Sequence, residues 1–338
     1  MRHRFHLVPA LLLGQILQGA PAAEPPAPPP PVAQSSAETL DEVVVVAPEP
    51  RYVAPTRRDR IGRVWVPVLI NGKGPFRLVL DSGATRSAVT ASVATRLGLS
   101  TDKTPPVILR GVTGTATVPT IRADSLEVGD LYIAPTTLPI VNDAFGGAEG
   151  LLGTEGLGDK RIYIDFRSDF INIARSKGTP ADDGFITLPT LRRPDQLLVV
   201  RATIGGVKAR AIIDTGAQAT VANRALRDAL EKRLHDADGT RDEITGATGE
   251  TQIGEGQIVS RIALGGVEIR SAHMTFGDMR IFSHWGMTDE PGLLVGMDIL
   301  GLVDTLIIDY KRRELMIRLR DGASRSGIHT GGDSTRIR

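Results

Sequence analysis

The sequence predicts a mainly β protein with two lobes and few short helices. Three observations support this fold class: the length, the alternation of apolar residues and an internal repeat. A chain of 338 residues with 41% hydrophobic content can cover two modest cores. Apolar residues alternate around glycine turns, as is typical of β-hairpins. The same features recur in the same order along the chain, so we expect two related lobes.

Residues 1–22 are typical of a signal peptide. Arg2 and Arg4 give a basic start, residues 7–17 are mostly apolar, and residues 20–22 are small enough for cleavage. We therefore expect an exported protein, periplasmic if the source is bacterial, with no stable membrane insertion after cleavage. An uncleaved anchor is the alternative, but the apolar stretch is about half of the ~20 residues that a spanning helix needs.

Residues 23–60 are expected to form a disordered linker, because residues 24–31 are almost all proline and alanine. Within it, residues 39–47 resemble the box by which outer-membrane receptors contact the energy-transducing protein TonB. A β-prone segment that pairs with a sheet edge or stays disordered is the favoured interpretation, and a TonB contact is the alternative. The tail at 321–338 is rich in Gly, Ser and Arg and is also expected to be disordered.

Each copy of the repeat opens with a hairpin that leads into an Asp-Ser/Thr-Gly-Ala sequence. Residues 64–80 alternate around a glycine-bearing turn and end at Asp81, and residues 198–213 do the same and end at Asp214. Each aspartate should therefore lie in a tight loop just after a strand.

Further elements follow each aspartate in the same order: a glycine-rich tip, a second hairpin, an apolar-apolar-Gly sequence and a strand-turn-strand that is expected to close its own lobe. The first set lies at 111–114, 129–130, 151–153 and 164–173, and the second at 246–249, 265–266, 294–296 and 308–317. The second copy is longer because of an insertion that contains His284 and Trp285. We assign residues 61–178 to a first lobe, 179–196 to a connector and 197–320 to a second lobe.

The composition limits the chemistry and the partners. Lys plus Arg number 40 and Asp plus Glu 39, so no strong field exists to attract nucleic acid or an anionic membrane. The absence of cysteine excludes disulfides, thiolate nucleophiles and cysteine-ligated metals. His235, His273, His284 and His329 lack the close pairing of a zinc-peptidase helix. We therefore expect no metal and no cofactor.

Asp81 and Asp214 are the candidate catalytic residues. Hydrolysis of an amide without metal or thiol requires a base that activates water and an acid that protonates the carbonyl oxygen. Two neighbouring carboxylates supply both, because they cannot ionise together comfortably and so share a proton. A pseudo-twofold repeat with one aspartate per copy brings two such groups face to face.

The residues after each aspartate have supporting roles. The hydroxyls of Ser82 and Thr215 can fix the two loops across the pseudo-twofold axis. Gly83 and Gly216 let the chain pass close to the carboxylates and keep them accessible.

Together these motifs resemble the retropepsin-like aspartic proteases, in a single-chain, exported bacterial form. The resemblance covers roughly residues 61–320. It implies two pseudo-twofold-related, closed-barrel lobes with Asp81 and Asp214 as the catalytic dyad. It also implies flaps that close on an extended peptide. The implied flap residues are Gly111, Val112, Thr113, Gly114, Gly246, Ala247, Thr248 and Gly249.

Two features depart from pepsins. Neither implied flap contains tyrosine, so flap closure and specificity are not carried over from them. Ala84 and Ala217 stand where many pepsins have a hydroxyl residue, which predicts a less acid pH optimum.

The expected function is that of an aspartic endopeptidase that acts on a peptide or protein in an interlobe cleft, as a monomer with an internal pseudo-dimer. Two alternatives remain open. One is a catalytically silent, periplasmic peptide- or protein-binding module on the same fold. The other is pairing of each lobe with its counterpart in another chain.

Overall fold

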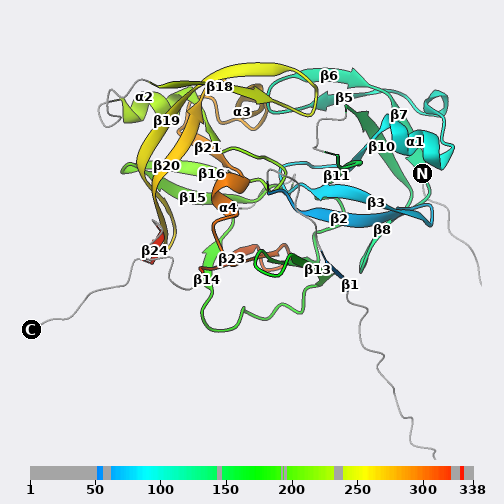
Figure 1. Cartoon of the computed structure of the whole chain (residues 1–338), viewed down its shortest axis with the longest axis horizontal. Helices are drawn as coiled ribbons and strands as arrows, with labels where there is room; N and C mark the ends of the chain where they lie inside the picture. Colours follow the sequence, from blue (N-terminus) through cyan, green and yellow to red (C-terminus); the bar gives the residue numbers. More distant parts are fainter. Residues whose placement is uncertain are drawn as a thin grey trace, which may run out of the picture. The chain divides into compact units, whose positions relative to one another are not determined.

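The computed structural model of the protein describes residues 52–55, 62–142, 147–191, 193, 196–231, 239–320 and 328–330. The predicted signal peptide (1–22), the TonB-box-like segment (39–47) and most of the predicted tail lie outside the described residues. The described part consists mainly of strands with four short α-helices, which confirms the predicted fold class (Figure 1).

The first lobe is built on an eight-stranded sheet with the order β7-β10-β4-β11-β3-β2-β8-β9. In β2, Val66, Val68 and Ile70 are buried and the residues between them are less so, as the strand period of two requires. The β5-β6 hairpin forms a sheet of its own. The elements are β2 (Trp65–Ile70), β3 (Lys73–Leu80), β4 (Ala88–Thr90), α1 (Ala91–Leu97), a 3₁₀ turn (Thr101–Lys103), β5 (Val107–Arg110), β6 (Thr115–Val118), β7 (Thr120–Ala123), β8 (Leu126–Val128), β9 (Leu131–Ile133), β10 (Thr136–Val141) and β11 (Gly150–Leu152).

The second lobe has the order β18-β19-β15-β16-β21-β17-β20-β24. Because β19 also pairs with β20, the six strands from β19 to β20 close into a barrel. The elements are β15 (Val199–Ile204), β16 (Val207–Ile213), β17 (Val221–Ala222), α2 (Arg224–Leu230), β18 (Thr240–Thr245), β19 (Thr251–Leu264), β20 (Val267–Phe276), α3 (Arg280–His284), β21 (Gly292–Val295), α4 (Met297–Leu300) and β24 (Ile328–Thr330).

The two lobes repeat the same strand pairings. In the first lobe β3 runs parallel to β11, and in the second β16 runs parallel to β21. β4 and β17 take equivalent places beside them. The lobes differ because the counterparts of β19 and β20 are divided in the first lobe into β7 with β8 and β9 with β10.

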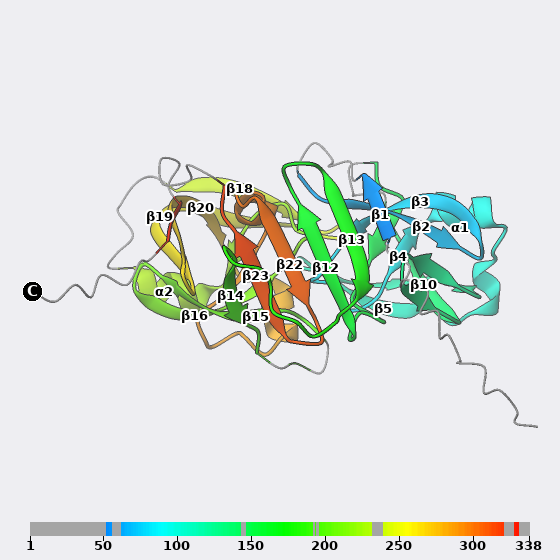
Figure 2. The ribbon, with the colours of Figure 1, turned by 90° about the horizontal axis from the view of Figure 1, so that it is seen from below.

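A six-stranded sheet joins the lobes, with the order β1-β13-β12-β22-β23-β14 (Figure 2). Its strands are β1 (Tyr52–Pro55), β12 (Lys160–Asp165), β13 (Phe170–Arg175), β14 (Ile186–Pro189), β22 (Thr305–Asp309) and β23 (Glu314–Arg318). At its centre β12 pairs antiparallel with β22, which sets Ile162 opposite Ile308, both fully buried. The expectation that each closing hairpin completes its own lobe is therefore wrong, because burying these apolar strands requires the partner hairpin.

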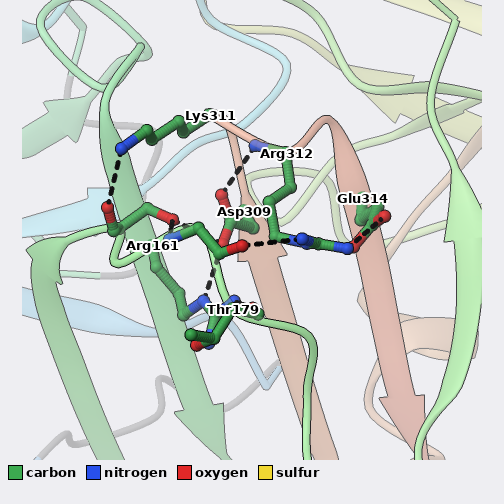
Figure 3. A network of polar contacts seen from close by, with 8 residues as sticks. Arg161, Thr179, Asp309, Lys311, Arg312 and Glu314 are labelled. Atoms are coloured by element: carbon green, nitrogen blue, oxygen red, sulfur yellow. Dashed lines mark hydrogen bonds and ion pairs between the residues drawn. The ribbon is translucent and has the colours of Figure 1, made fainter.

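A buried carboxylate ties the connector to this sheet (Figure 3). Asp309, fully buried, accepts hydrogen bonds from Arg161 Nε at 2.7 Å, Ser176 Oγ at 2.7 Å and the backbone N of Arg312 at 2.9 Å. Arg161 also donates to the carbonyl of Thr179, where the connector begins. The charge of Asp309 is thus fully partnered inside the protein.

Three strands lie in segments for which the sequence predicts no strand. β1 lies in the predicted disordered linker (23–60), β14 in the connector (179–196) and β24 in the predicted disordered tail (321–338). β1 pairs with β13 and β14 with β23, the strands that otherwise end the shared sheet. β24 pairs with residues 267–269 of β20, on the edge that the short strand β17 leaves free. The free backbone groups of those edges account for the added strands.

The apolar core is continuous between the lobes. One cluster of buried side chains includes Leu78 and Ile121 of the first lobe, Ile213 and Phe276 of the second, and Ile162 of the shared sheet. Within the described residues, no helix has the length and apolar character to cross a membrane.

Candidate active site

The two Asp-Ser/Thr-Gly loops lie at matched points of the lobes. The backbone N of Asp81 donates to the carbonyl of Leu152 at 2.9 Å, and that of Asp214 donates to the carbonyl of Val295 at 3.0 Å. Each aspartate thus leaves its strand beside the apolar-apolar-Gly element of the same lobe. This backbone hydrogen bond fixes the position of each aspartate, and therefore the point from which its carboxylate side chain extends.

The loops are bound to each other by their hydroxyl residues. Ser82 Oγ donates to the carbonyl of Ile213 at 2.8 Å, and Thr215 Oγ1 donates to the carbonyl of Leu80 at 2.7 Å. Each hydroxyl also accepts the backbone N–H of the other residue at 3.1 Å. Both side chains are buried, so these bonds rigidly join the lobes under the two carboxylates.

The glycines of one loop lie against the carboxylate of the other. A Cβ on Gly83 would lie 2.3 Å from Oδ2 of Asp214, and a Cβ on Gly216 would lie 2.3 Å from Cγ of Asp81. Within each loop, Gly83 N donates to Asp81 Oδ1 at 2.9 Å and Gly216 N donates to Asp214 Oδ1 at 2.8 Å. The structure therefore brings together all six residues that sequence reasoning placed around the dyad. Ala217 N also donates to Asp214 Oδ1, at 3.1 Å.

The two carboxyl groups have unequal surroundings. Burial raises the pKa of Asp81 well above its ordinary value, and the charge of Asp214 raises it further. Burial also raises the pKa of Asp214, but hydrogen bonds from Gly216, Asp81 and Ala217 oppose the rise. The pair therefore shares one proton, so that one carboxyl group is neutral while the other is ionised.

A second pair of carboxylates binds the backbone just after the two Asp-Ser/Thr-Gly loops. Glu155 accepts the backbone N–H of Ser87 at 2.6 Å, and Asp298 accepts that of Thr220 at 2.8 Å. Burial raises the pKa of both carboxyl groups. Sequence reasoning missed them, although each stands two residues after the glycine of an apolar-apolar-Gly element, a repeat that could have revealed them.

The predicted tips 111–114 and 246–249 do end hairpins, and they meet each other. Thr113 is fully buried, and its hydroxyl donates to the carbonyl of Glu250 at 2.7 Å and accepts from the backbone N of Gly246 at 3.1 Å. The symmetric hydroxyl, that of Thr248, is buried without a partner. The two tips therefore interlock, but not symmetrically.

Each tip also reaches the opposite lobe. Val112 packs on an apolar cluster of the second lobe, and its carbonyl accepts from the backbone N of Ile281 in α3 at 3.3 Å. Ala247 packs on an apolar cluster of the first lobe, and Asn142 Nδ2 donates to the carbonyl of Thr248 at 3.3 Å. The predicted insertion forms α3 and thus serves as a support for the first tip, a role that its sequence did not reveal.

The carboxylates and both tips line one cleft of about 1060 Å³. Its first-lobe half presents Ala84, Ala88, Leu109 and Leu151, and its second-lobe half presents Ala217, Val221, Ile244, Ile281, Trp285 and Leu294. Asp81 and Asp214 lie between these apolar surfaces, and within the described residues no group of three His, Asp or Glu side chains is placed to hold a metal ion. The cleft suits an extended chain with apolar side chains and offers two carboxyl groups to it.

The sequence matches the family model described as "Aspartyl protease" over residues 66–155 and 200–299. These ranges contain both Asp-Ser/Thr-Gly loops and more than half of the 338 residues, so the chain belongs to the aspartyl protease family. The family resemblance seen in the sequence is thereby confirmed.

Among solved structures, the crystal structure of an aspartic proteinase from Irpex lacteus is similar to this chain. The sequence identity is 12%, the TM-score is 0.48, and the similarity covers 82% of this chain and 99% of that one. No curated protein matches the sequence.

Proposed function

We propose that this protein is an aspartic endopeptidase that hydrolyses peptide bonds with a water molecule held between Asp81 and Asp214. The observation that carries the proposal is the contact of each carboxylate with the glycine of the opposite loop. That contact forces two carboxyl groups from distant parts of the chain to share one small space. Their unequal hydrogen bonding then separates an acid from a base.

The ionised Asp214 takes a proton from the water while the water oxygen bonds to the peptide carbonyl carbon. Asp81 gives its proton to the carbonyl oxygen, which yields a neutral tetrahedral intermediate without an acyl-enzyme. The C–N bond then breaks as the nitrogen takes the proton from Asp214. Asp81 recovers a proton from one hydroxyl of the intermediate, so the dyad returns to its starting state.

The flaps favour a substrate in an extended conformation. Tips 111–114 and 246–249 form a roof over the dyad, and an extended peptide beneath them can bond to their backbone groups as an added strand does. Apolar surfaces on both sides of the dyad favour apolar side chains next to the cleaved bond.

The test is hydrolysis of a mixed peptide library across acid to neutral pH by the wild-type protein and the variants Asp81→Asn and Asp214→Asn. We expect either substitution, and a statine-type transition-state mimic, to abolish cleavage. Asp124→Asn, at an exposed aspartate of the first lobe, is the matched control and should cleave normally. A stable wild-type protein that binds peptides but cuts none would instead support a catalytically silent binding module.

We also propose that the protein is exported and acts as a monomer. The basic and apolar residues before position 23 support export. N-terminal sequencing of the mature protein, cell fractionation and a mass measurement in solution test these points. Binding of a tagged TonB periplasmic domain to the protein with and without residues 39–47 tests whether this segment contacts TonB.

A further inference from the structure

A polar cluster lies in the second-lobe half of the cleft. Asp242 on β18 accepts hydrogen bonds from Thr240 Oγ1 at 2.8 Å and from Thr275 Oγ1 at 2.6 Å. Nε2 of His273 lies 3.3 Å from Oδ2 of Asp242. Asp242, His273 and Thr275 all line the cleft that contains the dyad.

The carboxylate of Asp242 is held in the charged form with room for another donor. Burial opposes its charge, but hydrogen bonds from Thr275 and Thr240 and the proximity of His273 lower its pKa. Its one ion-pair partner among the described residues is His273, and no lysine or arginine there pairs with it. A carboxylate has about four acceptor positions, and these contacts occupy three. The side chain is 20% exposed, which leaves access from the cleft.

Asp242 lies beside an apolar surface on the same face of its strand. Along β18, Asp242 and Ile244 are half-buried, while Arg241, Glu243 and Thr245 are exposed. Ile244 packs on the second-lobe apolar cluster that includes Trp285 and Leu294. Two residues of a strand span about 6.6 Å, and an extended peptide repeats its side chains at the same interval. A peptide with one side chain against Ile244 therefore presents the side chain two residues away to Asp242.

The first lobe has no equivalent of this cluster. Counted from the tips at Gly111 and Gly246, the counterpart of Asp242 is Val107. The pairings of β10 with β4 and of β20 with β17 make Thr137 and Pro139 the counterparts of His273 and Thr275. The charged side chains that the first lobe adds to the cleft, apart from Asp81, are Arg63, Arg86 and Arg110. Negative charge beyond the dyad therefore lies on one side of the cleft only.

We propose that Asp242, framed by Thr240, His273 and Thr275, is the specificity-determining carboxylate of a subsite for a basic side chain. The substrate class is a peptide with lysine or arginine two residues from the apolar side chain that rests against Ile244, on one side of the cleaved bond. This inference rests on the proposed function for its meaning in proteolysis. The ammonium or guanidinium group donates to Asp242 Oδ1, and the apolar stem lies along the cleft wall.

Peptide pairs test the subsite. Each pair is identical except for lysine or norleucine at one position, placed two residues from an apolar residue on either side of the cleaved bond. We expect the wild-type kcat/KM to be about tenfold or more higher for the lysine peptide on one side only. In Asp242→Asn, whose amide oxygen can still accept from one of the two threonines, the two peptides should become equal. Asp289→Asn, at an exposed aspartate of the same lobe, should keep the preference.

A binding measurement separates this inference from the proposed function. Non-cleavable reduced-bond versions of the same peptide pairs are titrated calorimetrically into the wild-type protein and Asp242→Asn. A lysine preference in binding that Asp242→Asn removes supports the subsite even if no peptide is cut, in which case only the proposed activity fails. Equal binding of the pair, no binding, or a preference that survives in Asp242→Asn overturns the subsite.

Discussion

Gly83 lies so close to Asp214 that a Cβ at this position would be 2.3 Å from Oδ2 and 2.5 Å from Cγ of the carboxylate. No side chain can occupy that space unless the carboxylate moves. The glycine after each Ser or Thr is thus required by the packing of the opposite aspartate rather than by its own backbone angles. The two loops hold each other's carboxylate in place.

Gly83→Ala should reduce kcat by about a hundredfold, because displacing a catalytic group by about 1 Å has effects of that size. Gly158→Ala is the control, since the nearest atom to its added Cβ would be 3.8 Å away. Steady-state kinetics on one peptide, with circular dichroism to verify folding, measures both variants. A Gly83→Ala enzyme with normal kcat would contradict the packing argument.

Ionisation of the dyad should make the stability depend on pH in a defined direction. Because the folded-state pKa of Asp81 is raised, the native state binds a proton that the unfolded chain has released. The contribution of Asp81 to the free energy of unfolding is therefore greatest below about pH 4, near the unfolded pKa of aspartate. This contribution falls as the pH rises through the folded-state pKa of Asp81. Asp81→Asn should raise the Tm at neutral pH and lose this advantage in acid. Thermal unfolding of both proteins across this range checks the sign, which a destabilised variant at neutral pH would refute.

The interlocked flaps should depend on Thr113 and not on Thr248. Thr113→Val removes a buried hydroxyl that bonds to Glu250 and Gly246, and the loss of about 1–3 kcal/mol should lower kcat/KM about tenfold or more by loosening the closed tips. Thr248→Val should have little effect, because its buried hydroxyl has no partner to lose. Kinetics on a long peptide measures the pair, and equal effects would contradict the asymmetry.

Asp309→Asn should destabilise the protein by about 3–5 kcal/mol, because it leaves Arg161 beside a neutral partner inside the fold. Asp165→Asn, the same position in the first lobe, should cost less, since Asp165 is only half-buried and accepts hydrogen bonds from the exposed residues Arg167 and Ser168. Denaturant unfolding monitored by fluorescence gives both free energies. Equal losses would show that the network in Figure 3 is not what holds the connector.

The repeat made much of the site predictable. Asp81, Asp214, their hydroxyl and glycine neighbours and the two hairpin tips follow from local patterns that occur twice. The structure brings the aspartates, their glycines and part of each tip to one cleft, while Ser82 and Thr215 are buried beside it. Each lies next to a turn or a strand end, where a few residues determine the conformation. Such local signals survive without knowledge of the tertiary structure.

What the sequence did not reveal depends on contacts between distant segments. The pairing of β12 with β22 cannot be inferred from either hairpin, because alternating apolar residues are equally compatible with closing one lobe or bridging two. The role of α3 depends on where Val112 lies, and the burial of Asp242 depends on Thr275 from another strand. These contacts emerge only when both lobes are packed together.

The presence of both lobes in one polypeptide affects how single mutations change the cleft. In an enzyme made of two identical chains, every mutation is expressed twice, so a carboxylate gained on one wall of the cleft appears on the other as well. Here Asp242 and its counterpart Val107 are encoded separately. The residues of each wall can therefore change independently, while the hydrogen bonds between Ser82 and Thr215 continue to join the two lobes.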